Sequence, residues 1–309
     1  MKTAEQQYLA ILENCYKNGI DVTNERTGSI CRTILNQRIQ FDGNEFPLLT
    51  TRKMYWKQAI GEMVGYIRGY TNTEQFHSLG VHTWDANALN SAWTESDIGK
   101  AMIEDGHDLG VIYGASANAK INVNYLLESN LAFCATDHIR TITINRQNSY
   151  LKICSQLRNS STDRGLIWSF WNPELFKFGC LRPCMYSHQF NVLDGTLHLT
   201  STQRSCDWVL GGAFNIVQCW FLLNITAKLT GLKVGTVTWN IANVHIYENQ
   251  ISLVSTQLER PFYQPPKLII KDNFDLVVLM ENLNKDNFED YFELQEYIYH
   301  PAIKYPFTV

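Results

Sequence analysis

Apolar and polar positions recur along the chain with two different periods, and these periods predict most of its elements. Residues 3–18 and 55–67 carry apolar side chains at helical spacing. Residues 30–41 have the pattern of a strand, which a polar turn at 42–45 closes. We therefore expect an opening helix, a strand and a second helix in this order.

A hairpin is the most specific local signal in the second half of the chain. The alternating segments 186–193 and 196–203 flank an Asp-Gly pair at 194–195, and such a pair favours a tight two-residue turn. Cys184 would then stand at the start of the hairpin and Arg204 at its far end. The pattern predicts further short strands at 139–145, 150–157, 166–170, 235–240 and 267–270.

A strongly apolar segment follows the hairpin. Residues 216–229 are apolar nearly all round, which is typical of a helix buried at the centre of a protein. Asn215 is placed as its N-cap and Gly231 as its C-cap. A further helix is expected at 245–253. The tail, 299–309, stays apolar to its last residue, so we expect it to dock on the body of the protein.

The composition is that of a globular protein with a large buried core. Of the 309 residues, 45% are hydrophobic and 12% aromatic, and the sequence contains no repeat, low-complexity segment or linker. Because helices and strands are interspersed, we predict one α+β domain over residues 1–309. The net charge of −4 argues against a polymeric nucleic acid as partner, since proteins that bind one usually present a basic face.

The sequence also indicates where the protein works. The first residues lack the apolar core of a signal peptide, and we find no run of about 18 apolar residues that would predict a membrane span. The eight cysteines are scattered without C-x-x-C pairs, which is typical of reduced thiols rather than a disulfide framework or a zinc site. We expect a cytoplasmic protein with no membrane partner and no metal.

Cys184 is the candidate nucleophile of the chain. It directly follows Pro183, and Arg204 could hold its thiol ionised. A polar run leads from there to the amide of Asn215. Thiolate, cation and amide are the groups needed for covalent attack on an electron-poor ring. Each residue also has a simpler interpretation, because free cysteines are usually inert core residues and Asn215 would serve as a helix cap.

Three other polar residues can be placed only from where residues of their type usually lie in proteins. Glu62 stands among apolar neighbours, but glutamate is rarely buried, so we expect it on the solvated face of its helix. His245 and Tyr247 are two positions apart on an expected helix and would not share a face. A metal site would need more ligands at suitable spacing than the sequence offers. Taken singly, these residues indicate no site.

One motif joins several of these residues: Gln203-Arg204-Ser205-x-Asp207, followed by Leu210-Gly211 and Phe214-Asn215. Further short runs match in the same order, namely Arg26-Thr27-Gly28, Phe46-Pro47-Leu48-Leu49-Thr50-Thr51, Gly69-Tyr70-Thr71-Asn72, Trp84-Asp85, Cys184, His245-Ile246-Tyr247 and His300-Pro301-Ala302-Ile303-Lys304. With them the chain resembles the thymidylate synthase superfamily over nearly its whole length. Only the middle, roughly 88–160, is looser.

The resemblance implies a fold and a reaction. The fold would be α+β, a single domain with a large twisted mixed sheet at the interface of a homodimer, flanked by helices. The enzyme would transfer one carbon from 5,10-methylenetetrahydrofolate to C5 of a pyrimidine nucleotide. Cys184 would add to C6 of the ring, which turns C5 into an enolate that attacks the methylene. Glu62 and Tyr113, with water, would move the protons at C5 and around O4.

The same resemblance implies the remaining roles. The nucleotide would be bound by Arg26, Arg204 and Ser205 at the phosphate, by Arg164 lent from the partner subunit, by His245 and Tyr247 at the sugar 3′-hydroxyl, and by Asn215 at the base. The folate pocket would be formed by Trp84, Leu181, Asp207, Leu210, Gly211, Phe214 and the C-terminal Val309. Arg204, Asp207 and Asn215 would also belong to the catalytic group.

Several positions depart from the synthase pattern. Met185 stands where the family has a histidine, and Asn87 stands where it has a second tryptophan. The other departures are Ala115-Ser116-Ala117-Asn118 in place of a Gln-Trp-Arg run, Asp163-Arg164-Gly165 in place of paired arginines, and Trp239-Asn240-Ile241-Ala242-Asn243 in place of a His-Thr-x-Gly-Asp run. The Trp-Asn pair and the two losses are similar to the phage deoxycytidylate hydroxymethylases, a sister branch of the superfamily.

These departures bear on how the reaction ends. A synthase reduces the exocyclic methylene by hydride from the folate, whereas a hydroxymethylase lets water add to it. Asn87 in place of a bulky apolar wall would admit and orient that water near the folate. The amide of Asn215 can donate to O4 and accept from N3–H, which suits uracil, although an amide can also flip to meet cytosine.

We therefore predict a phage-type deoxyuridylate hydroxymethylase, acting in the host cytoplasm, that makes 5-hydroxymethyl-dUMP as a precursor for modified DNA. One alternative is a divergent thymidylate synthase, and another is a hydroxymethylase of dCMP or CMP. A fourth hypothesis is a catalytically retired relative that binds a nucleotide or RNA. The intact set of Cys184, Arg204, Asp207, Glu62 and Tyr113 argues against the last of these.

Overall fold

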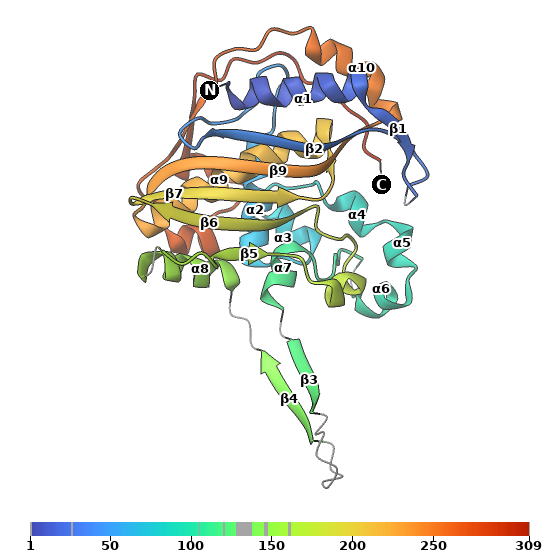
Figure 1. The fold of residues 1–309 in the computed structure, drawn as a ribbon, viewed down its shortest axis with the longest axis vertical. Helices are drawn as coiled ribbons and strands as arrows, with labels where there is room; N and C mark the ends of the chain where they lie inside the picture. The colour runs from blue at the N-terminus through green and yellow to red at the C-terminus, as the bar shows by residue number, and fades with distance from the viewer. Residues whose placement is uncertain are drawn as a thin grey trace.

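A mixed sheet runs through the molecule and places the candidate site at one end of its strands (Figure 1). The computed structural model describes residues 2–25, 27–104, 106–119, 121–127, 138–144, 148–159 and 162–308. Within them, the sheet has the strand order β1-β2-β9-β7-β6-β5, with β8 beside β9. Strands β7 and β8 run parallel to β9, and the other neighbours are antiparallel. The expected α+β fold with a large mixed sheet is confirmed.

The elements have the following bounds. The helices are α1 (Ala4–Asn18), α2 (Trp56–Arg68), α3 (Thr73–His77), α4 (Asp85–Ala88), α5 (Ser91–Thr94), α6 (Asp97–Met102), α7 (Tyr113–Asn118), α8 (Ser149–Asn159), α9 (Ala213–Thr230), α10 (Glu248–Leu258) and α11 (Phe288–Tyr291), with short turns η1 (Pro173–Phe178), η2 (Trp208–Gly212) and η3 (Val278–Asn282). The strands are β1 (Ile20–Thr23), β2 (Ile30–Asp42), β3 (Ile121–Leu127), β4 (His138–Ile144), β5 (Ile167–Ser169), β6 (Met185–Leu193), β7 (Thr196–Gln203), β8 (Cys206–Asp207), β9 (Lys233–Tyr247), β10 (Lys267–Ile270) and β11 (Phe292–Gln295).

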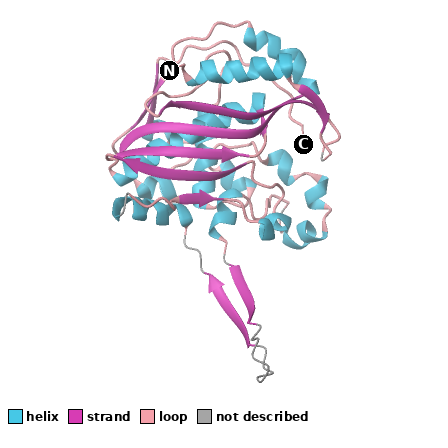
Figure 2. Ribbon diagram, viewed as in Figure 1, coloured by secondary structure: helices cyan, strands magenta, loops and turns pink. Residues whose placement is uncertain are grey.

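Helices gather on one side of the sheet. Helix α9 packs against β7 and β9, α2 and α8 pack against α9, and α1 packs against β2 and α10. Figure 2 shows the broad strands in front of α9 and α2, with the side of the sheet turned to the viewer left open. Half-buried polar side chains alternate along that open side, namely Gln189, Thr200, Thr202, Thr238 and Asn240. Strands β3 and β4 pair with each other and project from the body (Figure 1).

The hairpin of β6 and β7 forms as predicted. Asp194 and Gly195 have φ values of 48° and 69°, and a tight two-residue turn of this kind needs positive φ at both positions. The register pairs Met185 with Gln203. The start of the hairpin and its far end are therefore neighbours in space, and the backbone N–H of Arg204 donates to the carbonyl of Cys184 at 2.9 Å.

Helix α9 is the buried core helix that the sequence predicts. It ends at Gly231, whose φ of 73° is the left-handed conformation of a helix C-cap. Within the described part of the chain, the stretch Trp208–Thr230 is long and apolar enough to cross a membrane by length and composition, although our search for an apolar run found none. The most apolar 18-residue window of this stretch is 72% buried in the fold, which is typical of a core helix rather than a membrane span.

The segment expected to be a strand at 150–157 is instead the helix α8, so that prediction was wrong. Its buried side chains are Tyr150, Ile153, Cys154 and Leu157. They recur at positions i, i+3, i+4 and i+7, which is the period of one helical face.

Two further predictions near the site were wrong in their boundaries. The strand expected at 235–240 extends through Tyr247, and α10 begins only at Glu248, so His245 lies on a strand rather than a helix. Asn215 is not the N-cap of α9, because the helix already begins at Ala213. The turn η2 before it is capped by Asp207, whose side chain accepts from the N–H of Leu210 at 3.2 Å.

Candidate active site

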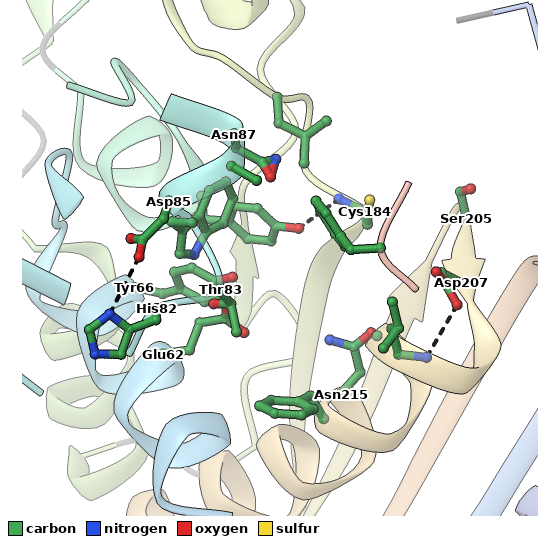
Figure 3. A pocket seen from close by; sticks show the side chains of 18 of the residues that line it. Glu62, Tyr66, His82, Thr83, Asp85, Asn87, Cys184, Ser205, Asp207 and Asn215 are labelled. Carbon is green, nitrogen blue, oxygen red and sulfur yellow. Dashed lines mark hydrogen bonds and ion pairs between the residues drawn. The ribbon is translucent and has the colours of Figure 1, made fainter. Parts of the chain in front are cut away.

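A cavity of about 570 Å³ lies beside the first residue of the hairpin and collects most of the candidate site residues. Figure 3 shows Glu62, Thr83 and Asn87 on one side of it and Cys184, Asp207 and Asn215 on the other. The cavity is lined by Glu62, Tyr66, His82, Thr83, Trp84, Asp85, Ala86, Asn87, Tyr113, Leu181, Cys184, Gln203, Ser205, Asp207, Leu210, Gly211, Phe214, Asn215 and Phe307. Segments more than 200 residues apart in the sequence thus form one site.

The thiol of Cys184 lies beside the guanidinium of Arg204. Arg204 donates from Nε to the carbonyl of Pro183 at 2.9 Å and from Nη2 to the carbonyl of Arg182 at 3.0 Å. These hydrogen bonds hold Nη2 at 3.9 Å from Sγ of Cys184. The pair therefore has the geometry of a candidate cysteine nucleophile beside a fixed cation.

Tyr113 places its hydroxyl against the backbone of Cys184. The hydroxyl oxygen accepts a hydrogen bond from the backbone N–H of Cys184 at 3.1 Å. The φ of Tyr113 is 33°, in the left-handed region that few residues other than glycine adopt, and its ring stacks on Tyr66 at 4.3 Å. A Cβ at Gly114 would lie 1.6 Å from the carbonyl oxygen of Tyr66, so only glycine permits this approach. Burial raises the pKa of Tyr113 well above its ordinary value, so the hydroxyl keeps its proton.

Glu62 is buried, and the expectation of a solvated side chain was wrong. It lies on α2, with 8% of its surface exposed, and both carboxylate oxygens have partners. Oε1 accepts from the hydroxyl of Thr83 at 2.6 Å, and Oε2 accepts from the amide of Gln218. Burial raises the pKa of Glu62, while these hydrogen bonds lower it. A buried carboxyl with a raised pKa that opens onto a cavity suits proton transfer near neutral pH.

Asp207 and the C-terminal tail are joined by one buried amide. Nε2 of Gln250 donates to Oδ2 of Asp207 at 2.9 Å and to the carbonyl of Pro306 at 3.0 Å. Tyr305 is also buried, so the tail docks as predicted. Burial raises the pKa of Asp207 to about 6, and the hydrogen bond from Gln250 opposes that rise. Gln250 therefore couples a cavity-lining carboxyl to the position of the tail.

Replacing Gln250 with methionine is expected to weaken folate binding and spare nucleotide binding. The variant loses both hydrogen bonds, and also the one that Oε1 of Gln250 accepts from the backbone N–H of Tyr247 at 2.9 Å. The tail and Asp207 lose a common anchor, so we expect KM for the folate to rise about tenfold. Titration of the nucleotide alone should give a Kd within about twofold of the wild type. The control is Asn249→Ala, which removes an exposed contact with Thr308 of the same tail. Equal losses for both ligands would indicate general damage and contradict this role.

A second cavity of about 290 Å³ adjoins the first at Ser205. It is lined by Val22, Asn24, Cys31, Thr33, Arg204, Ser205, Asn243 and His245. The predicted phosphate and sugar ligands Arg204, Ser205 and His245 thus come together in one polar recess. Arg26, another predicted phosphate ligand, lies outside the described residues, although Asn24 borders the recess.

His245 and Tyr247 share a face, contrary to expectation. Both lie at the end of β9, and residues two apart on a strand point to the same side. Their rings meet edge to face at 5.3 Å, and Nδ1 of His245 lies 2.9 Å from Oδ1 of Asn243. The pair is buried, which suits two ligands of a single hydroxyl group.

The remaining predicted residues divide between the cavity and its surroundings. All the predicted folate-pocket residues except Val309 line the cavity, namely Trp84, Asn87, Leu181, Asp207, Leu210, Gly211 and Phe214. Val309 lies outside the described residues, and Phe307 is the tail residue that reaches the cavity. Arg164 is exposed before β5 and lies outside both lining sets, so its role toward a partner subunit stays a prediction.

One cluster at the rim has the residue types of a metal site. The side chains of His77, His82 and Asp85 place one potential ligand atom each within 4.8 Å of one another. Asp85 already engages both histidines, with Oδ1 at 2.6 Å from Nε2 of His77 and Oδ2 at 3.4 Å from Nδ1 of His82. The ligand atoms thus satisfy one another, and we assign no ion to the cluster.

Sequence reasoning overlooked several residues of the site. Tyr66 supports Tyr113, Thr83 holds Glu62, and Gln250 joins Asp207 to the tail. Gln218 contacts both Asn215 and Glu62. A signal for Gln218 was present, because it follows Asn215 by three positions on a helix and such residues are neighbours.

Comparison with known proteins identifies the family. The family model "Thymidylate synthase" matches residues 6–309. The chain belongs to the thymidylate synthase family. It is 43% identical over 309 residues to the thymidylate synthase of Shewanella loihica, 43% over 310 residues to that of Aliivibrio fischeri, and 42% over 308 residues to that of Vibrio parahaemolyticus. Each alignment covers 98% of this chain and the whole of the relative.

These relatives bear on the branch that the sequence indicated. They are named thymidylate synthases, not hydroxymethylases, so the family is confirmed and the assignment to a phage hydroxymethylase branch is not supported. Membership of the family shows that the protein is an enzyme that transfers one-carbon units. The product of the transfer is a separate question.

Proposed function

We propose that the protein transfers the one-carbon unit of 5,10-methylenetetrahydrofolate to C5 of dUMP and reduces it to a methyl group, giving dTMP and dihydrofolate. The observation that carries this proposal is the thiol of Cys184, which stands 3.9 Å from Nη2 of Arg204 and opens onto the cavity that also holds Asn215 and Tyr113. A nucleophile, a cation and an amide therefore lie close enough together to contact one nucleotide base.

The arrangement suggests a role for each group in the first half of the reaction. Sγ of Cys184 would form a bond to C6, and the electron pair of the C5–C6 double bond would move to C5 and O4. C5 would then form a bond to the methylene carbon of the folate. Loss of the proton from C5 would break the bond between that carbon and the folate nitrogen and leave an exocyclic methylene on the ring. Tyr113 adjoins the nucleophile, and Glu62 lies deeper in the same cavity with a raised pKa, so these two groups would move the proton from C5 and around O4.

The outcome of the second half is proposed on the relatives. Three full-length relatives that are 42–43% identical carry the name thymidylate synthase. In that outcome the folate gives a hydride to the exocyclic methylene, the thiol leaves C6, and the folate departs oxidised as dihydrofolate. We therefore place reductive methylation ahead of the hydroxymethylation that the departures in the sequence indicated.

Hydroxymethylation is kept as a second candidate because of one residue. Asn87 lines the cavity as a half-buried amide, and an amide can bind and orient a water molecule where a bulky apolar side chain would exclude it. In that case tetrahydrofolate would leave without being oxidised, water would add to the exocyclic methylene, and the thiol of Cys184 would leave C6.

A count of dihydrofolate separates the two candidates. The enzyme is incubated with dUMP and methylenetetrahydrofolate while absorbance in the dihydrofolate band and consumption of the nucleotide are followed together. We expect one dihydrofolate for each nucleotide consumed. Nucleotide consumed without that rise would contradict reductive methylation and favour hydroxymethylation.

The matched variant for this assay is Asn87→Trp, which replaces the amide by an apolar wall. It should leave the ratio of dihydrofolate to product at one if the wild type is a synthase. If the wild type is a hydroxymethylase, the variant should raise that ratio from near zero. Parallel reactions with dCMP and CMP test the base and the sugar.

We also propose that the protein acts as a homodimer through the open side of its sheet. Half-buried polar side chains such as Thr200 and Thr238 alternate along that side, which α9 and its neighbouring helices leave uncovered (Figure 2). Exposed Arg164 would then be free to serve the site of a partner subunit. The cytoplasmic location expected from the sequence stays a prediction, whereas the phage origin is not supported by the relatives.

A further inference from the structure

The carboxyl group of Glu62 is held between one buried amide and one exposed hydroxyl. Nε2 of Gln218 donates to Oε2, and Oγ1 of Thr83 donates to Oε1 at 2.6 Å. Gln218 is fully buried, whereas Thr83 is exposed and lines the cavity on the same side as Glu62 (Figure 3). We infer that Glu62 exchanges its proton through Oε1 alone, and that the hydroxyl of Thr83 relays this proton between Glu62 and the cavity. The inference rests on the proposed function, since it names a further residue that would act in that reaction.

The orientation of the Gln218 amide is fixed by a series of hydrogen bonds. Nδ2 of Asn215 donates to Oε1 of Gln218 at 2.8 Å, and Oδ1 of Asn215 accepts from Nε2 of Gln203 at 2.9 Å. Gln203 in turn accepts from the indole N–H of Trp239, which can only donate, and donates to the carbonyl of Ser205, which can only accept. Gln218 therefore presents its NH2 group, and not its oxygen, to Glu62.

The two carboxyl oxygens of Glu62 consequently differ. The NH2 group of Gln218 can only donate, so Oε2 must accept a hydrogen bond whether the carboxyl group is ionised or not. A proton on Oε2 would set donor against donor and leave a buried group unsatisfied. Oε1 faces a hydroxyl, which can donate to a carboxylate and accept from a carboxylic acid. Oε1 is therefore the atom on which Glu62 takes up and releases its proton.

Two hydroxyl groups of the cavity lining lie near Glu62, those of Thr83 and Tyr66. Burial raises the pKa of Glu62, and hydrogen bonds from Thr83 and, to a smaller extent, Tyr66 oppose that rise. Tyr66 is 4% exposed, and burial raises its pKa well above the ordinary value, so its hydroxyl keeps its proton. Of the two hydroxyls, the exposed one of Thr83 is the one that meets both Glu62 and the solvent of the cavity.

The relay moves one proton at a time and leaves no charge on Thr83. As a group in the cavity gives a proton to Oγ1, the hydroxyl passes its own hydrogen to Oε1 of Glu62, so one O–H bond forms and another breaks at the same oxygen. In the proposed reaction the proton comes from C5 of the ring, directly or through one water molecule. After the product leaves, the exchange runs in reverse and the proton passes from Oε1 through Oγ1 to water. Glu62 is then a carboxylate again.

The test compares Thr83→Val with Thr83→Ser in steady-state kinetics over a range of pH. Valine has the shape of threonine without the hydroxyl, so we expect the plateau of kcat against pH to fall about 30-fold, with the Kd of dUMP within about threefold of the wild type. Serine keeps the hydroxyl and should recover the plateau to within about threefold of the wild type. A Thr83→Val profile that shifts to higher pH but reaches the wild-type plateau would show that Thr83 only tunes the pKa of Glu62, and would overturn the relay.

The comparison isolates Glu62 because the rest of the lining does not change. Its other titratable side chains are Tyr66, His82, Asp85, Tyr113, Cys184 and Asp207. They are common to the wild type and the two Thr83 variants. Tyr66→Phe tests the competing hydroxyl, and a loss of rate there that equals or exceeds the loss in Thr83→Val would assign the relay to Tyr66 and contradict the inference.

Gln218→Met tests the fixed role of Oε2. It should shift the profile to higher pH, because Glu62 loses a hydrogen bond that favours its ionised form, and an unshifted profile would refute that role. If this buried change unfolds the protein, the Thr83 variants carry the test without it.

The matched control is Thr73→Val. Its hydroxyl lies 3.2 Å from Nδ1 of His107, outside the lining of the cavity, so the plateau should stay within about twofold of the wild type. A loss as large as that in Thr83→Val would indicate general damage and speak against the relay. A wild type that consumes no dUMP would instead overturn the proposed function, whereas an active wild type matched in its plateau by Thr83→Val would overturn the relay alone.

Discussion

Cys184→Ser is expected to lower kcat by roughly 10³-fold or more while dUMP still binds with a Kd within about threefold of the wild type. A serine hydroxyl is far less nucleophilic than a thiol, so the bond to C6 should form much more slowly even with Arg204 in place beside residue 184. The hydrogen bond from the backbone N–H of residue 184 to Tyr113 does not involve the side chain and should persist. Steady-state kinetics and calorimetric titration with dUMP check the two parts.

The matched control is Cys180→Ser. Cys180 lies four residues before the nucleophile, outside the lining of the cavity, and burial raises the pKa of its thiol to about 12. It should therefore stay protonated and contribute nothing as a nucleophile, and its replacement should change kcat by less than about twofold. Turnover that survives in Cys184→Ser would sink the assignment of the nucleophile.

Glu62→Gln should have the second largest effect, a fall in kcat of about 10²–10³-fold with little change in the Kd of dUMP. The variant amide can still accept from Gln218 and can meet the hydroxyl of Thr83, which serves as donor or acceptor, so the local geometry should hold. What it loses is the ability to take up and release a proton. The pH profile of kcat should accordingly lose the ionisation of Glu62, which burial places above the ordinary carboxyl range.

Stability offers a second measurement on the same variant. Folding raises the pKa of Glu62, so this group favours the folded state fully below its ordinary pKa and loses that contribution as the pH rises through the folded value. The free energy of unfolding of the wild type should therefore fall relative to that of Glu62→Gln between acid and neutral pH. Denaturant titrations of both proteins at several pH values measure the difference.

Glu45→Gln controls for the loss of a partly buried carboxyl elsewhere. Burial also raises the pKa of Glu45, but its Oε1 accepts from the backbone N–H of Ala4 at the start of α1, away from the cavity. This variant should keep the wild-type kcat and its pH profile. If Glu62→Gln retained both as well, proton transfer would have to be assigned to another group.

Local pattern and local chemistry account for the parts of the fold that the sequence predicted. The Asp194-Gly195 turn, the α2 helix and the Gly231 cap depend on neighbours within a few positions, and all three formed as expected. The boundary of β9 was missed because the strand continues through a polar stretch that is stabilised by pairing with β2 on one edge and with β7 and β8 on the other. His245 and Tyr247 therefore lie on one face of a strand and not on the helix that the sequence predicted.

The sequence by itself determined the family, because Cys184, Arg204 and the motif around Asp207 are a specific combination of residue types in a fixed order, and the same residues are its candidate nucleophile and cation. It could not determine the burial of Glu62, the anchoring of the tail through Gln250 or the orientation of the Asn215 amide. Desolvation depends on every segment that packs around a group, and a hydrogen bond needs a partner in space, here up to 156 residues away. Only the tertiary structure brings those partners together, and they control the pKa of the Glu62 carboxyl.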